Sequence, residues 1–277
     1  MKKIVLVGLA LIGFTLAKAQ DDTDKKFRFG LKVTPSINWL KIDDEKSYAK
    51  GGSVAKFGYG LIMEFKITDV AAFTTGFQVD YDGGKVKCTD TMGYYYNEDK
   101  GFLANEDIGT DAASYLTSTT GYTGYTLLDR KYNSMYLTVP LQIKLRTKEI
   151  GYMTYFGNIG LLTSIHIKTK ATDNVYSYDA SFNKVTSEIE KLDISKDMNF
   201  LKAGLAIGGG VEMNLSGSTS FLIGVQFTQG FMNTVKKDSK FNIDGEKIDF
   251  TVNPYVIAQQ AQKFLGQNFS LTLGILF

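Results

Sequence analysis

The chain has little of several residue types that often organise a soluble protein. Its 277 residues include one cysteine (Cys88), one histidine (His166), one tryptophan and three prolines. A single cysteine excludes an intramolecular disulfide, and we expect no role for Cys88. The formal net charge of +2 is too small to indicate binding to nucleic acid, so no nucleic-acid partner is expected.

Long apolar runs are also scarce. The run from Ile4 to Leu16 is too short to span a membrane, follows two lysines and leads into Ala17-Lys-Ala19. This order is typical of a secretory signal peptide rather than a membrane anchor, so we expect residues 1–19 to be removed and residues 20–277 to form one domain. An exported chain without further apolar runs of helix-spanning length is either soluble or a β-barrel.

Glycine and aromatic residues are abundant, with 28 Gly, 19 Phe and 16 Tyr. In several segments apolar and polar residues alternate with a period of two, which predicts strands with one apolar face. The last eleven residues, Gln267 to Phe277, show the pattern most clearly and remain apolar to the end. The predicted strands are Phe27–Lys41, Ser53–Lys66, a segment from the turn at Val70 to Asp82, Tyr132–Thr147, Tyr152–Thr169, Met198–Leu215, a segment after Ser218 to Phe231, and Gln267–Phe277.

The connections between these segments alternate in length. Every second one is a turn of a few residues, and the others are long: about Ile42–Gly52, Gly83–Lys131, Lys170–Asp197 and Met232–Lys263. Short periplasmic turns and long extracellular loops are typical of outer-membrane barrels. The sequence therefore predicts an all-β fold: an eight-stranded antiparallel up-and-down transmembrane β-barrel in the cell outer membrane, with its apolar face against outer-membrane lipid.

Two prolines carry local predictions. Pro140 interrupts the fourth predicted strand, and because it lacks an N–H we expect a bulge there. Asn253-Pro254 precedes a segment that ends at Gly266, a spacing that predicts a short helix packed on the barrel mouth.

Two motifs resemble a known family. Tyr136-Leu-Thr-Val-Pro140-Leu141 and the closing strand from Asn268 to Phe277 are similar to those of the PorT-like outer-membrane β-barrel family of Bacteroidetes, often labelled a porin family. The resemblance covers residues 27–277 and implies an eight-stranded barrel in the cell envelope. The terminal Phe277 also resembles the signal read by the barrel-assembly machinery, which would be a partner during biogenesis.

The inner face of the predicted barrel is rich in charge. An eight-stranded barrel has room inside only for side chains. We therefore expect a salt-bridged lumen, with a narrow anion-preferring pore as the alternative. The predicted charge network comprises Arg28, Lys32, Lys56, Glu64, Lys66, Asp80, Lys144, Arg146, Lys202 and Glu212.

Tyrosines cluster within the predicted long loop, in the region Lys85–Lys131, among Gly, Thr, Ser and Asn. Such a mixture supplies rigid aromatic contact area together with adaptable hydrogen bonding, so this loop is a candidate surface for an extracellular or envelope protein partner. The alternative is a solvated loop that only shields the barrel. The predicted contact residues are Tyr94, Tyr95, Tyr96, Tyr122 and Tyr125, with Tyr115 nearby.

Enzymatic chemistry has weak support. His166 and Ser164 share one face of a predicted strand, but neighbouring side chains on one face point in parallel and no acid partner can be named. Acidic groups such as Asp21 to Asp24 lack the spacing of a calcium loop. We expect no catalytic residues, no metal and no cofactor, and we favour a structural or surface-interaction protein over a pore or an outer-membrane hydrolase or acyltransferase.

Overall fold

The computed structural model describes residues 26–42, 48–103, 121–178, 183–217, 219–244, 259–261 and 263–277. The predicted signal segment, residues 1–19, and Tyr115 lie outside these ranges. No helix in the described ranges is long and apolar enough to cross a membrane.

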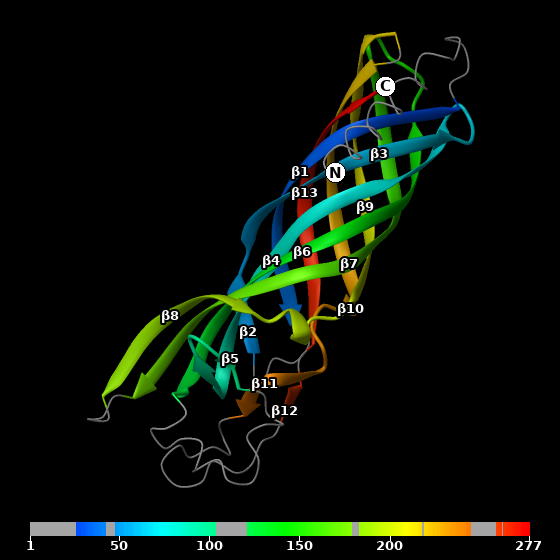
Figure 1. The fold of residues 1–277 in the computed structure, drawn as a ribbon. Helices are drawn as coiled ribbons and strands as arrows, with labels where there is room; N and C mark the ends of the chain where they lie inside the picture. The colour runs from blue at the N-terminus through cyan, green and yellow to red at the C-terminus, as the bar shows by residue number, and fades with distance from the viewer. Residues whose placement is uncertain are drawn as a thin grey trace, which may run out of the picture.

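Eight long strands close into an antiparallel ring (Figure 1). Around the ring their order is β4-β3-β1-β13-β10-β9-β7-β6, and β6 pairs back with β4. Antiparallel pairing of β1 with β13, with Leu31 opposite Ile275, joins the two ends of the chain. The predicted eight-stranded barrel is therefore confirmed. The ring strands are β1 (Phe27–Ile42), β3 (Val54–Lys66), β4 (Ala71–Asn97), β6 (Thr123–Arg146), β7 (Met153–Tyr178), β9 (Leu201–Ser216), β10 (Thr219–Asn233) and β13 (Phe264–Leu276).

The side chains are distributed in the opposite way to those of a soluble protein. Leu31 on β1 is 60% exposed and Ile207 on β9 is 55% exposed, whereas Glu64 and Lys144 are each 2% exposed. Water favours the reverse arrangement, since buried charges are costly and exposed apolar surface is unfavourable. A hydrocarbon surround accounts for an apolar outer face on every strand of the ring.

Aromatic rings mark both edges of this apolar belt. At the end with the short turns, Phe27 packs 5.0 Å from Phe65, measured between ring centroids. At the other end Phe57 packs 4.8 Å from Tyr81. Aromatic girdles at both interfaces are a general feature of outer-membrane barrels. The two pairs therefore mark where the apolar belt begins and ends along the strands.

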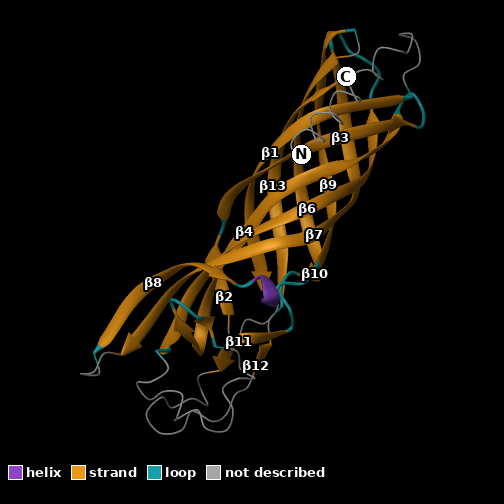
Figure 2. Cartoon of the chain, in the orientation of Figure 1, coloured by secondary structure: helices purple, strands orange, loops and turns teal. Residues whose placement is uncertain are grey.

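The two ends of the barrel differ sharply. The connections β3–β4, β6–β7 and β9–β10 span only residues 67–70, 147–152 and 217–218. At the other end the strands continue into an external part that holds the remaining elements (Figure 2). These elements are β2 (Tyr48–Gly52), β5 (Gly101–Phe102), β8 (Lys184–Asp193), β11 (Asp238–Asp244), β12 (Gln259–Ala261) and the 3-10 helix η2 (Ser195–Asp197).

The predicted long loops are partly wrong. Within Gly83–Lys131, the described residues continue β4 to Asn97 and begin β6 at Thr123. Within Lys170–Asp197, the second half of β7 pairs with β8 as a hairpin. These segments form strands because their inward side chains are apolar and pack on one another, a pattern that differs from that of the belt.

The predicted helix from Asn253 to Gly266 is also wrong where the chain is described. Gln259–Ala261 form β12, and Phe264 begins β13 opposite Ile42. Phe264 is fully buried, so strand pairing with burial of this ring prevails over the local helix signal. The rest of the predicted helix lies outside the described residues.

The bulge predicted at Pro140 is absent from the β4–β6 pair. The register is the same at Thr74 opposite Gln142 and at Gln78 opposite Thr138, which places Gly76 at the level of Pro140 in a stretch where the two strands are not paired. Gly76 has φ +150°, and a Cβ there would lie 2.1 Å from the carbonyl oxygen of Leu61. Because glycine can adopt this backbone conformation, β4 accommodates the missing N–H of Pro140 without an extra residue in either strand.

A bulge occurs instead on β7. Met135 pairs with Lys168 and Tyr136 with His166, so one residue of β7 is unmatched. Because side chains alternate along a strand, this insertion exchanges the two faces of β7. Beyond it Thr169, Ala171 and Asp173 point inward and are fully buried.

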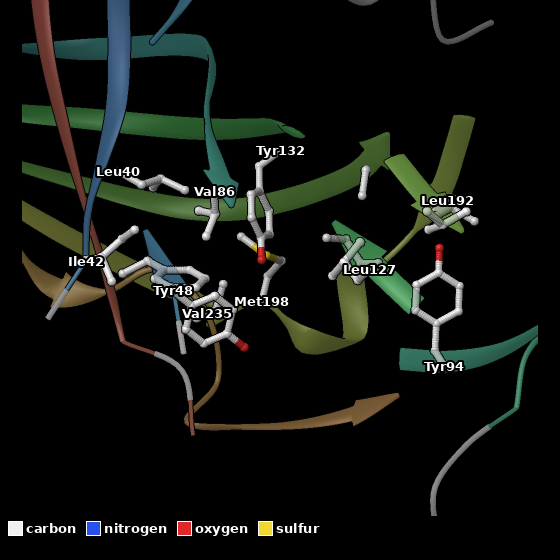
Figure 3. Packing of buried hydrophobic residues seen from close by; sticks show 14 residues of the cluster. Leu40, Ile42, Tyr48, Val86, Tyr94, Leu127, Tyr132, Leu192, Met198 and Val235 are labelled. Carbon is white, nitrogen blue, oxygen red and sulfur yellow. The ribbon is translucent and has the colours of Figure 1, made fainter. Parts of the chain in front are cut away.

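The external part has its own apolar core. Figure 3 shows side chains from β1, β2, β4 and β6 pointing toward one another, and Met198 and Val235 lie among them. We call this set the external core: Leu40, Ile42, Tyr48, Val86, Tyr94, Leu127, Tyr132, Ala171, Val175, Leu192, Ile194, Met198, Val235 and Phe264. The inner face of the barrel therefore changes from polar within the belt to apolar above it.

Candidate functional site

The lumen near the short turns is occupied by charged side chains from four strands. Arg28 donates from Nη2 to Glu64 Oε1 at 2.7 Å and to Glu212 Oε2 at 2.9 Å. Lys144 donates from Nζ to Glu64 Oε2 at 2.9 Å and also to Glu212. Arg146 forms an ion pair with Glu64. We call these five residues the charge cluster; three cations share two carboxylates and connect β1, β3, β6 and β9 through the interior of the barrel.

Amide side chains form the next layer of the lumen. Gln142 donates from Nε2 to Gln226 Oε1 at 2.8 Å, and Asn158 donates from Nδ2 to the same oxygen at 3.0 Å. Asn158 also donates to Gln142 Oε1 at 3.2 Å. These bonds join β6, β7 and β10 across the interior, so the lumen is cross-linked above the charge cluster as well.

A small polar cavity of about 60 Å³ lies higher in the lumen. Lys32, Asp80, Asp82 and Lys202 line it, and Lys202 forms an ion pair with Asp82. Gln78 donates to Thr34 Oγ1 at 2.7 Å on its wall. At roughly 10–15 Å³ for each water centre, this cavity has room for a few water molecules and not for a continuous aqueous channel. The charge network predicted from sequence does not include Asp82, because the predicted strand ends at this residue and a predicted loop begins at Gly83.

Of the lysines expected in the lumen network, Lys56 lies elsewhere, whereas Lys66 lies at the mouth of the lumen, where it lines a cavity with Arg28, Glu64 and Arg146. Lys56 donates from Nζ to Asn133 Oδ1 at 2.6 Å, and Asn133 lies on the outward parity of β6, between the buried Tyr132 and Ser134. Lys66 pairs with Asp69 at 2.9 Å in the β3–β4 turn. This is a correction to the sequence-based interpretation: pairing of β3 with β4 ends at Gly58 opposite Asp80, which lets Lys56 leave the inner face.

The external core closes the barrel on the other side of the polar cavity. A buried ion pair lies beside it: Arg130 Nε donates to Asp173 Oδ1 at 2.8 Å and Nη2 donates to Oδ2 at 2.7 Å. Tyr94 donates from its hydroxyl to Asp173 Oδ2 at 2.9 Å. Arg130 is 3% exposed and Asp173 is fully buried. A two-point contact of this kind has a fixed geometry, so it determines how β6 and β7 meet β4 above the membrane.

Burial and the Asp173 carboxylate together determine the pKa values of Tyr94 and Arg130. Burial and the adjacent Asp173 carboxylate raise the pKa of the Tyr94 hydroxyl far above its usual value. Burial opposes the charge on Arg130, but Asp173 outweighs it and the pKa of the guanidinium is raised. Both effects keep Tyr94 neutral and Arg130 charged. Arg130 shares the inward parity of Tyr132 and could have been found from sequence; Asp173 was hidden by the β7 bulge.

The predicted tyrosine contact surface is partly wrong. Tyr94 is 1% exposed and Tyr95 is 3% exposed, so neither side chain can contact a partner in this conformation. Tyr94 is buried because its hydroxyl satisfies Asp173, and its ring packs 5.0 Å from Phe102. Tyr96, Tyr122 and Tyr125 are half-buried. Lys100 Nζ lies 5.7 Å from the centre of the Tyr122 ring.

Cys88 packs against the external core, and burial raises the pKa of its thiol to about 12. At pH 8 roughly one such thiol in 10⁴ is ionised, against about a quarter for an ordinary cysteine. We therefore expect alkylation of Cys88 by iodoacetamide at pH 8, followed by mass spectrometry, to be slower in the folded protein by a factor on the order of 10³ than in denaturant. Equal rates would show that the thiol is not buried.

His166 and Ser164 do not form a nucleophile–base pair. His166 Nε2 lies 2.8 Å from Thr169 Oγ1, and Ser164 Oγ lies 2.9 Å from Thr138 Oγ1. Among the described residues, no three His, Cys, Asp or Glu side chains are grouped so that they could hold a metal ion. The Ser164 bond joins the neighbouring strands β6 and β7, and the His166 bond lies within β7.

The chain terminus is held at the rim of the barrel. Phe277 donates its backbone N–H to the carbonyl oxygen of Phe29 at 2.7 Å, and its ring lies 5.6 Å from the Phe29 ring. The final aromatic residue therefore contributes to the girdle on the side of the short turns.

A closed antiparallel ring with an apolar outer belt agrees with the comparison with known protein families. The sequence profile of the outer membrane protein beta-barrel domain matches residues 18–236, most of the chain. The chain belongs to this family. Its place is therefore the outer membrane, where the short turns face the periplasm and the external part faces outward.

Solved structures similar to this family member are also outer-membrane proteins. Neisserial surface protein A is 8% identical, with 91% of this chain and 96% of that chain covered and a TM-score of 0.39. OprG from Pseudomonas aeruginosa is 13% identical, with 91% and 95% covered and a TM-score of 0.37. Ail, the attachment invasion locus protein of Yersinia pestis, is 12% identical, with 91% and 99% covered and a TM-score of 0.35. Similarities of this size carry no argument about function. No match was found among curated proteins.

Proposed function

We propose that the protein is a non-conducting, non-enzymatic outer-membrane barrel with a structural role, which presents its external part to molecules outside the cell. The observation that carries this proposal is closure of the lumen at two separate heights. The charge cluster fills the periplasmic end, and the external core fills the outer end. Between them the described residues enclose small cavities, the polar one of about 60 Å³ and another of about 40 Å³ beside Lys144, Gln142 and Asn158, and neither is large enough for a continuous aqueous path.

The second candidate is a narrow pore that prefers anions. It is favoured by the excess of cations in the charge cluster, where Arg28, Lys144 and Arg146 face Glu64 and Glu212. An anion entering from the periplasm would meet net positive charge. This candidate also requires the external core to open, because Tyr132, Met198 and Val235 lie above the lumen.

Planar-bilayer recording of the refolded protein decides between the two candidates. We expect no discrete conductance from the wild-type chain, because each ion would have to displace buried ion pairs and then cross an apolar layer. Insertion is verified separately by the heat-dependent shift of the folded band on a gel. Stable conductance steps with a reversal potential set by the anion gradient would overturn the closed-barrel proposal and support the pore.

The finer assignments belong to the same proposal. Residues 1–19 would direct export, Phe277 would be read by the barrel-assembly machinery, and the two motifs around Pro140 and in the closing strand support a PorT-like barrel of Bacteroidetes. Contact with an extracellular or envelope protein would involve Tyr96, Tyr122 and Tyr125, whose side chains are only half-buried.

A further inference from the structure

Lysines are concentrated on the outward faces of three adjacent strands, immediately beyond the apolar belt. Their neighbours along each strand point inward and are buried, as Val86, Tyr132 and Ala171 show with exposures of 1%, 4% and 0%. The lysines therefore project away from the barrel. We call this set the lysine face; it comprises Lys85 and Lys87 on β4, Lys131 on β6, and Lys168 and Lys170 on β7.

Strand register places these cations close together. Lys85 lies directly opposite Lys131 on the neighbouring strand, and Lys170 lies opposite Asn133. Lys56 reaches the same area from β3, because its Nζ donates to Asn133 Oδ1 at 2.6 Å. Like charges directly opposite each other destabilise a sheet. Among the described residues of this face, Lys87 lies opposite Asp129 and Lys170 opposite Asp193, so Lys85–Lys131 is the like-charged pair, and an anion lying against it would offset the repulsion.

Few carboxylates compensate this charge. On the outward faces of β4, β6 and β7 in this stretch, as far as side chains are described, the acidic residue is Asp129, which accepts a hydrogen bond from Asn174 at 2.9 Å. Asp193 on β8 lies 4.0 Å from Lys168. Six lysines with Lys56 included therefore face two carboxylates. The whole chain has a formal net charge of only +2, so the positive charge is local.

The height of the lysine face points to the chemistry of its partner. Tyr81 of the outer aromatic girdle is paired with Met135, and Met135 is paired with Lys168. Lys85 is four residues beyond Tyr81 on β4, a distance on the order of 10 Å along a strand. Lipid headgroups occupy this zone next to the hydrocarbon. A lysine stem can lie along the apolar surface while its ammonium group reaches the headgroup.

We propose that the lysine face binds the phosphate groups of phosphorylated lipids in the outer leaflet. The proposal rests on the transmembrane placement of the barrel that underlies the proposed function. A headgroup is favoured over a soluble polyanion because the register places the cations directly beyond the girdle on three strands. These strands, β4, β6 and β7, are neighbours in the barrel wall (Figure 1). There lipid phosphates stand in a row at one height.

The test uses Trp39, the single tryptophan, as an energy donor. Trp39 belongs to the outer end of β1, next to Gln267 on β13, so it reports on lipids at the outer rim. The full chain is refolded into phosphatidylcholine vesicles that contain a small fraction of dansyl-labelled lipid. The label is placed on phosphorylated lipid A, on dephosphorylated lipid A, or on phosphatidylcholine. We expect energy transfer to indicate enrichment of the phosphorylated lipid by roughly fivefold or more, and high salt to abolish it.

A variant with Lys85, Lys87, Lys131, Lys168 and Lys170 all replaced by Gln should reduce this enrichment to about onefold, since the anion-binding charge is gone. The matched control replaces Lys26, Lys66, Lys100, Lys148 and Lys184 by Gln, removing the same charge elsewhere, and should keep the wild-type preference. If the first variant does not insert, the salt dependence of the wild-type preference still decides.

Three outcomes would overturn the proposal: no preference in the wild type, equal enrichment of phosphorylated and dephosphorylated lipid, or unchanged enrichment in the first variant. Binding of inorganic polyphosphate to the protein in neutral vesicles, without lipid preference, would assign the lysine face to a soluble polyanion and overturn the lipid partner. Failure of the wild type to insert into any vesicle would instead contradict the proposed function, so the two failures are distinguishable.

Discussion

Replacing Asp173 with Asn is expected to destabilise the external core by about 3–5 kcal/mol, because Arg130 then remains buried without its charged partner. The two-point contact at 2.8 and 2.7 Å and the Tyr94 hydroxyl bond at 2.9 Å all end on this carboxylate. The external core should lose ordered tertiary packing while the barrel keeps its pairing in the membrane. Near-ultraviolet circular dichroism and trypsin cleavage in urea measure the first effect, and the heat-dependent gel shift monitors the second.

Asp129→Asn is the control for this experiment. Asp129 precedes Arg130 on β6 and points outward. It accepts a hydrogen bond from Asn174, but it is only half-buried. Its replacement should change stability by less than about 1 kcal/mol. The double variant Arg130→Met, Asp173→Leu should recover most of the loss, because apolar side chains of similar size can replace a buried ion pair. A single Asp173→Asn variant as stable as the wild type would contradict the structural role of this pair.

Replacing Glu64 with Gln is expected to have an effect of similar size in the lumen. Arg28, Lys144 and Arg146 all contact Glu64, so its removal leaves three cations with the single carboxylate of Glu212. Loss of one partner from a buried network costs about 3–5 kcal/mol. Unfolding in urea from lipid vesicles measures this loss.

Glu149→Gln, in the exposed β6–β7 turn, is the matched control and should have no measurable effect. The double variant Glu64→Gln, Lys144→Met restores the original excess of one cation and should recover part of the stability. If Glu64→Gln unfolded at the same urea concentration as the wild type, the charge cluster would not contribute to holding the barrel closed.

The sequence could predict the belt because one rule applies along its whole length. Between Phe27 and Trp39, apolar side chains meet lipid and polar ones meet the lumen, so a period of two fixes both strand and face. The rule fails above the membrane, where the inward side becomes apolar. Val86 and Asp82 both point inward on β4 and are buried. A prediction that expects polar residues on the inner face does not recognise Val86 as part of the strand and assigns the segment to a loop.

Which charged residues pair with one another was harder to predict than which of them face the lumen. Parity alone assigns Arg28, Glu64 and Lys144 to the inner face, but which of them meet depends on the stagger of strands that are distant in sequence. Glu64 and Lys144 are 80 residues apart, and the Lys144 Nζ–Glu64 Oε2 distance of 2.9 Å depends on the register of β3 against β4 and of β4 against β6. Asp173 was beyond reach for another reason: a one-residue bulge has no clear signal in the sequence and reverses every face that follows it.

The length of β4 has a mechanical consequence. At about 3.3 Å per residue, its 27 residues make a strand of roughly 90 Å, about three times the thickness of the hydrocarbon layer. Pairing with β6 begins at Ala71 and reaches Tyr96, with a register shift between Lys87 and Met92, so the distal end is coupled to the bilayer by paired strands and not by a single unpaired chain. A molecule captured at its tip would be held at a set distance from the cell surface, and a pull on that molecule would be transmitted directly to the lipid-embedded wall.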